Sequence, residues 1–591
     1  MPRSTFAFSN FTSGELSPRL DGRIDLPKYY SGCKTLENMI VHPHGGATRR
    51  PGTRFIAETK SNGEARLVPF EFSTTQTYVL EFGNTYMRVY KDGGQVLNSG
   101  TPVEISTPYS AAEANELKFA QSADVLFIVH PSHQPRKLSR TSHTSWSLSL
   151  YAPTNNPFTS TNNFPSTITF FEERLVFAGT NAAPQKIFFS KSGDFEDMTT
   201  GTNATDGMTF TIGSDQVNAI KYIKGLRTLL IGTTGGEFVA TASSSAEPIT
   251  PTNIQIKRQA GYGTSEVDAL LAGNRILFVQ RAGKKVRELV FDFDTDGYIA
   301  PDLTILAEHI GGSGVGTGFT NWTYQQEPDS IVWVVRSDGV LTGMTYQRGE
   351  NVVAWHRHIL GGAFSGGDAV VESVAAISNS TASSRGEDTL YMIVKRTING
   401  GTKRYIEYLQ PFDFGSNIED AWFLDSGLVY SGSATTSLSG LDHLEGQTVS
   451  ILANGATHAD KVVSSGAVTL DRSATKAIVG LKYTSKLQTM RIESGSAEGI
   501  AQGKVKRIHE IVARFFETVG AEIGSSSSQV DLIPFRDSSM AMDQPVSLFT
   551  GDKSIEFASD YQTDNFVYIQ QTQPLPMTVT ALFPQLNTYD G

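Results

Sequence analysis

Three aspartates near the middle of the chain have the spacing of a metal-binding loop. Asp292, Asp294 and Asp296 alternate along the sequence and are followed by Gly297, which is how a calcium-binding loop begins. Position 12 of such a loop normally supplies a glutamate, and here it is Leu303. Two interpretations stay open: a weak calcium site, or an acidic turn between two strands.

Two groups of basic residues are candidates for contacts with an acidic partner. The first precedes a Pro-Gly turn near residue 50, and the second lies beside an apolar stretch near residue 510. The docking candidates are Arg49, Arg50, Lys504, Lys506 and Arg507. The alternative for each group is a solvated turn or a solvated strand face, since most charged side chains lie in water.

The sequence has no recognisable catalytic motif. It lacks the nucleophile-elbow, zinc-protease and phosphate-loop patterns. Its single cysteine, Cys33, excludes a disulfide within the chain and a cysteine-based metal cluster. Spacing alone cannot show two carboxylates facing one sugar. We therefore predict no enzymatic activity and no cofactor.

The elements that would position these residues are short β-strands. Residues 274–293 contain an apolar run from Ile276 to Val279, a turn at 281–283 and a second apolar run from Val286, which is typical of a β-hairpin. Similar units begin roughly every 50 residues between 66 and 415, the period of a β-propeller blade. We predict an all-β chain with a propeller-like domain at 66–415. An irregular array of β-sandwiches is the alternative.

The remaining segments differ from this repeat. Residues 1–65 carry Gly or Pro every few positions, which excludes a long helix and predicts an extended segment packed with the C-terminal region. Residues 416–493 predict a small β-barrel or sandwich. Residues 494–591 predict a C-terminal β region that completes a platform, with a long strand at 503–516.

Composition limits the function classes. The net charge of −11 argues against a free-standing nucleic-acid-binding protein, which is normally basic. It does not exclude a surface that guides nucleic acid without holding it. No run of 18 apolar residues occurs, so we expect no transmembrane helix. We expect synthesis in a reducing cytoplasm.

Several sequence blocks resemble tail nozzle proteins of short-tailed bacteriophages, the tail tubular protein B type. The early blocks are Gly14–Pro18, Gly22–Asp25, Tyr29–Gly32, Leu36–Asn38, Gly45–Gly46 and Arg49–Thr53. The later blocks are His443–Val449, Val479–Tyr483 and Gly503–Ile508. The order of the blocks, more than any one of them, carries the resemblance. The chain is shorter than the best-known nozzles, so a tip or fibre-docking insertion would be missing or reduced.

The resemblance implies a structural component of a virion tail. It implies a homohexamer below the head-to-tail adaptor ring, with tail fibres or spikes attached nearby. The tube would retain the genome, conduct double-stranded DNA during ejection without binding it, and meet the host envelope. The alternatives are a receptor-binding, glycan-binding or glycan-depolymerising tail component, or a tail hub or plug protein.

Overall fold

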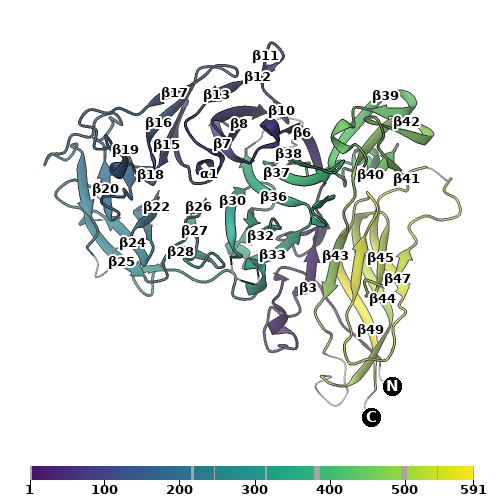
Figure 1. Cartoon of the computed structure of the whole chain (residues 1–591). Helices are drawn as coiled ribbons and strands as arrows, with labels where there is room; N and C mark the ends of the chain where they lie inside the picture. The colour runs from purple at the N-terminus through teal and green to yellow at the C-terminus, as the bar shows by residue number, and fades with distance from the viewer. Residues whose placement is uncertain are drawn as a thin grey trace.

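The computed structural model describes residues 3–213, 218–244, 247–312, 314, 316–378, 386–493, 502–541 and 544–589. It consists of a propeller and a second β-rich body beside it (Figure 1). No helix in the described ranges is long and apolar enough to cross a membrane. The two chain ends lie close together at the far end of the second body.

The propeller has seven blades in the described part of the chain. The first three blades are β7 (Ala65–Ser73), β8 (Gln76–Gly83), β9 (Tyr86–Lys91) and β10 (Gly94–Gln95), with β13 (Glu104–Ser106) on β9; β14 (Lys118–Ser122), β15 (Val125–His130), β16 (His133–Arg140) and β17 (Trp146–Leu150); and β18 (Thr167–Phe171), β19 (Arg174–Ala178), β20 (Lys186–Phe189) and β21 (Met208–Thr211). A single-turn helix, α1 (Ala111–Ala114), joins the first two blades.

The other four blades repeat this antiparallel order. They are β22 (Ile220–Gly225), β23 (Leu229–Thr233), β24 (Gly236–Thr241) and β25 (Gln255–Ala260); β26 (Leu270–Ala272), β27 (Arg275–Val279), β28 (Val286–Asp292) and β29 (Gly297–Ile299); β30 (Phe319–Gln325), β31 (Ile331–Arg336), β32 (Leu341–Gln347) and β33 (Val352–His358); and β36 (Val370–Ile377), β37 (Thr389–Ile398), β38 (Gly401–Leu409) and β6 (Thr53–Glu58). The predicted propeller is confirmed, and the sandwich array is not what forms.

The continuous apolar runs reflect burial on both faces of a blade. In β27, Leu277 and Val279 belong to the core shared with the sixth blade. Ile276 and Phe278 belong to the core shared with the fourth blade. Successive side chains of a strand point to opposite faces, so both sets of positions must be apolar. A propeller blade therefore lacks the alternation of polar and apolar residues seen in a solvated sheet.

The ring closes through a core between the seventh and first blades. Leu67 and Tyr90 of the first blade pack there with Tyr391 and Ile393 of the seventh. The outer strand of the seventh blade is β6, which pairs antiparallel with β38. β6 precedes the first blade in sequence, but it completes the seventh and last blade. The propeller thus begins at residue 53, and the predicted boundary at 66 was wrong.

The second body combines both ends of the chain. β1 (Arg3–Thr5) pairs with β49 (Thr578–Tyr589). One sheet runs β4 (Met39–Val41), β5 (Ala47–Arg49), β49, β44 (Val505–Thr518) and β47 (Phe549–Glu556). Its core joins Phe8 and Leu36 to Ile511 and Leu582. The predicted strand at 503–516 is confirmed as β44. We call this body the platform.

Two sheets run without interruption from the propeller into the rest of the molecule. The sixth blade continues through β2 (Gly14–Glu15), β3 (Gly32–Glu37), β43 (Ser485–Thr489), β48 (Tyr568–Gln571), β45 (Ala521–Ser526) and β46 (Gln529–Ile533). The seventh blade continues from β6 into β39 (Asp425–Ser439), β42 (Ala467–Leu481), β40 (Thr448–Ala453) and β41 (Ala456–Val462). Backbone hydrogen bonds, rather than a flexible linker, join the parts.

β39 to β42 form the predicted small β domain with its own core, which includes Leu444, Ile451 and Val479. Its strands end at Leu481, and β43 belongs to the platform sheet, so the predicted limit at 493 was too far along the chain. The predicted start of the C-terminal region, residue 494, falls in 494–501, outside the described residues.

Candidate functional site

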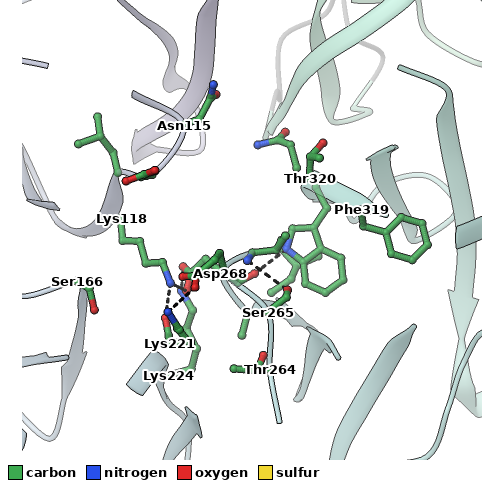
Figure 2. A pocket seen from close by; sticks show the side chains of 18 of the residues that line it. Asn115, Lys118, Ser166, Lys221, Lys224, Thr264, Ser265, Asp268, Phe319 and Thr320 are labelled. Carbon is green, nitrogen blue, oxygen red and sulfur yellow. Dashed lines mark hydrogen bonds and ion pairs between the residues drawn. The ribbon is translucent and has the colours of Figure 1, made fainter. Parts of the chain in front are cut away.

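A polar cavity opens where the propeller blades meet. The first strands of the blades contact one another in series, for example β36 with β7, β30 with β36, and β26 with β30. The cavity has a volume of about 1090 Å³ and is lined by residues from these strands and from the turns that lead into them. We call it the central cavity (Figure 2).

Lysines from two blades converge on one aspartate in the central cavity. Lys224 Nζ lies 2.7 Å from a carboxylate oxygen of Asp268, and Lys118 Nζ lies 3.8 Å from the other oxygen. Burial would raise the pKa of Asp268, but the two lysines lower it below its ordinary value. Burial lowers the pKa of Lys118. Figure 2 shows Lys118, Lys221 and Lys224 gathered around Asp268.

A half-buried arginine, Arg66, holds the wall of the central cavity. Arg66 of β7 donates through Nη1 to the carbonyl oxygens of Asn115 at 3.0 Å and Leu117 at 2.7 Å. Burial lowers its pKa to about 10. The indole nitrogen of Trp322, from β30, donates to the carbonyl oxygen of Asp268 at 2.7 Å. These contacts connect the first, second, fourth, fifth and sixth blades, so the charges in the cavity hold the ring together.

A second polar site lies where the propeller, the platform and the small domain meet. Arg50 forms a two-pronged ion pair with Asp425, with N–O distances of 2.8 and 2.6 Å. Both side chains are fully buried, at 1% and 0% exposure. Burial would lower the pKa of Arg50, but the Asp425 carboxylate raises it. The guanidinium also stacks 3.8 Å from the ring centroid of Tyr483. We call this group and its hydrogen-bonded neighbours the junction network.

The junction network extends into the seventh blade. The carboxylate of Asp425 also accepts hydrogen bonds from the backbone N–H groups of Gly361 at 2.7 Å and Thr53 at 3.2 Å. The hydroxyl of Thr53 donates to Glu407 at 2.6 Å, and Glu407 pairs with Arg396, both fully buried. Charges removed from water persist only when they are paired in this way. The network therefore specifies one relative placement of the three parts.

Three of the predicted docking residues lie inside the molecule. Arg49 and Arg50 are 1% exposed and Lys506 is 0% exposed. Arg49 donates to the carbonyl oxygen of Tyr483 at 2.9 Å, and Lys506 pairs with buried Glu493 at 2.8 Å. The proposal that these three residues dock a partner was wrong, because their charges are used within the subunit.

The other predicted residues remain near the surface. Arg507 is exposed, with its guanidinium 5.8 Å from the ring centroid of Tyr561, while Lys504 is half-buried and has a contact of its own. Asp292, Asp294 and Asp296 form the turn between β28 and β29. Within the described ranges, one group of acidic and histidine side chains has converging ligand atoms, and the three aspartates are not in it. The structure therefore gives the calcium interpretation no geometric support.

Sequence reasoning missed Lys118, Asp268 and Asp425, and it assigned Arg50 a different role. Lys118 and Asp268 belong to different blades, and Arg50 and Asp425 are separated by 375 positions. No local pattern connects such residues, because the closure of the ring and the long-range strand pairing bring them together.

Comparisons with known proteins find similarity at the level of the propeller. No protein-family model and no curated protein match the chain. Among solved structures, the β-propeller domain of Cps50 (Swd1) from Myceliophteria thermophila has a TM-score of 0.35 at 9% identity, covering 60% of this chain and 99% of that one. U3-55K has a TM-score of 0.37 at 10% identity, covering 61% of this chain and 99% of that one. YCF48 bound to D1 peptide has a TM-score of 0.33 at 12% identity, covering 62% of this chain and 98% of that one. At such values the likeness carries no argument about function.

Proposed function

We propose that the chain is a structural subunit of a short phage tail. It would form a ring, six copies in the nozzle proteins that it resembles, below the head-to-tail adaptor, and conduct DNA without catalysis. The observation that carries this proposal is the position of the resembling blocks. Asn38, Arg50, Thr53 and Tyr483 come from three separate blocks and belong to the junction network, in which Arg50 Nε donates to Asn38 Oδ1 at 3.0 Å. The shared residues therefore support one inter-domain geometry.

The architecture suits a wall that carries load. Two sheets cross from the propeller into its neighbours, and a buried ion pair fixes the angle between the parts. A tube under internal pressure needs subunits that do not bend at a hinge, and continuous sheets meet that need. Net charge of −11 per subunit also suits a conduit, since phosphate contacts would slow the passage of DNA.

The tryptophans give little support to the glycan-binding alternative. Sugar-binding sites commonly use an open aromatic face, and here every tryptophan is at most 9% exposed. Trp322 lines the central cavity, but its indole N–H is already bonded to Asp268. The conduit is therefore the function that the geometry supports best.

Electron microscopy of the purified chain, alone and mixed with the adaptor ring of the same particle, tests the proposal. We expect rings that stack coaxially on the adaptor and a distinct band in sedimentation. A protein that stays monomeric and ignores the adaptor would contradict it. Labelling of intact particles with an antibody to the chain should mark the tail, and label on the capsid alone would also contradict it.

A further inference from the structure

Two histidines and a glutamate converge beside the central cavity. His130 ends β15 and His133 begins β16, so the two residues face each other across the turn, with ring centroids 5.2 Å apart. Glu113 comes from α1, in the connection between the first two blades. One ligand atom from each of the three lies within 4.8 Å of the others. In the sequence, the His-x-x-His spacing of His130 and His133 is the sign of this group.

Ser110, which caps the helix α1, fixes the carboxylate of Glu113. Glu113 Oε2 accepts hydrogen bonds from the backbone N–H of Ser110 at 2.8 Å and from its hydroxyl at 2.9 Å. The other oxygen, Oε1, is thereby aimed at His133 Nε2, 3.0 Å away. The Ser110 backbone N–H, the largest cause, lowers the pKa of Glu113 to about 2.

His130 is almost fully buried, at 2% exposure, and a metal ion binds the neutral form of an imidazole. Burial together with the nearby His133 lowers the pKa of His130. Its Nε2 lies 3.2 Å from Oε2 of Glu116, an exposed carboxylate that lines the central cavity. A fourth ligand is thus within reach by rotation of one side chain.

We propose that Glu113, His130 and His133 bind one divalent transition-metal ion of the Zn²⁺ class. Two imidazoles and one carboxylate form a mixed nitrogen and oxygen set, which favours Zn²⁺, Co²⁺ or Ni²⁺ over Ca²⁺ and Mg²⁺, whose ligands are oxygens. Metal–ligand bonds of about 2 Å require the three atoms to approach by roughly 1 Å. Glu116 or water completes the coordination.

Binding has a structural consequence at the turn. The backbone N–H of Ser132 donates to Nδ1 of His130 at 3.0 Å, so the ring proton lies on Nε2. An ion on Nε2 requires this proton to move to Nδ1, and the Ser132 contact is then lost. The ion would tie α1 to the β15–β16 turn beside the segment that holds Arg66, and so stiffen the mouth of the central cavity. The site does not depend on the proposed function.

Calorimetric titration of the chelator-treated full-length chain with ZnCl₂ tests the site. We expect one ion per chain. His133→Asn should bind Zn²⁺ at least about tenfold more weakly, because losing a direct ligand should reduce affinity no less than losing a residue that only hydrogen-bonds a ligand. Co²⁺ in the site should give the intense visible absorption of a four-coordinate ion. His44→Asn is the matched control, since His44 is an exposed histidine in the β4–β5 turn, and it should bind like the wild type.

Two results would overturn the proposal. One is a wild-type chain with no saturable zinc binding. The other is unchanged affinity in His133→Asn, which would assign the ion to other histidines. If His133→Asn fails to fold by circular dichroism, Glu113→Gln replaces it, with the same weakening expected and the same affinity as wild type counting against the site.

Discussion

At the scale of single residues, the Arg50–Asp425 pair has the largest structural role. Neither side chain reaches water, and each also bonds a backbone group of another segment, Arg50 the carbonyl oxygen of Ile359 and Asp425 the N–H of Gly361. A buried pair is not by itself a large source of stability, because desolvation offsets the attraction. Removing one of the two charges destabilises the fold strongly, since the other charge stays buried without a partner. The pair therefore acts through specificity, holding three segments in one arrangement.

Asp425→Asn should lower the free energy of unfolding by about 3–5 kcal/mol, because Arg50 loses its counter-charge inside the protein. Urea denaturation followed by tryptophan fluorescence measures the change. Asp25→Asn is the control, since Asp25 pairs with Arg23 at the surface, where both side chains are more than half exposed. The control should unfold at the same urea concentration as the wild type. Equal midpoints for both variants would contradict this role.

At the scale of elements, β6 is the strand on which the architecture depends. It closes the seventh blade through β38 and passes the same sheet on to β39. The chain reaches β6 through Gly52, whose N–H donates to the carbonyl oxygen of Trp422 at 2.7 Å. A Cβ atom at this position would lie 2.0 Å from the carbonyl oxygen of Leu424. Only glycine permits this approach of the two backbones.

Gly52→Ala should lower the free energy of unfolding by at least about 1–3 kcal/mol, because the added methyl forces β6 away from the segment before β39. Differential scanning calorimetry would show a lower unfolding temperature, and limited proteolysis would show faster cleavage near residue 52. Gly349→Ala is the control, since nothing lies within 4 Å of a Cβ there. A wild-type melting temperature in Gly52→Ala would show that β6 has room to move.

At the scale of the whole molecule, charge and rigidity determine how the protein meets DNA. The net charge is −11. In the central cavity, Lys224 pairs with Asp268, Lys221 pairs with Glu266, and Arg66 donates to backbone carbonyl oxygens. Arg49, Arg50 and Lys506 are likewise buried. These described cations are paired or buried, so they are not available to hold a phosphate backbone, whose binding scales with the number of such contacts.

The purified chain should therefore give no retarded species with linear double-stranded DNA at about 0.15 M salt, where screening already weakens surface charges. An electrophoretic mobility shift assay is the measurement, and a basic DNA-binding domain is the positive control. Tight binding with a steep salt dependence would instead indicate a DNA-binding protein, and would count against a passive conduit.

The local part of the fold was predictable because it depends on neighbours in sequence. The turn at Asn454–Gly455 has positive φ at both residues, as a tight hairpin turn requires, and the β27–β28 hairpin follows from its apolar runs. The metal-binding candidates fared differently. The acidic turn at Asp292–Asp296 has the spacing of a metal-binding loop, but its carboxylates do not converge. Glu113, in contrast, reaches His133 only because α1 packs against the first blade.

The sequence by itself determined that this chain makes hairpins of β-strands in a regular series, since strand periodicity and turn residues are local properties. Only the tertiary structure decided that β6 closes the ring, that both chain ends build one platform, and that Arg50 is an interior residue rather than a docking contact. The physical reason is that a charged side chain near a Pro-Gly turn belongs in water unless a partner is supplied, and its partner, Asp425, lies 375 positions away.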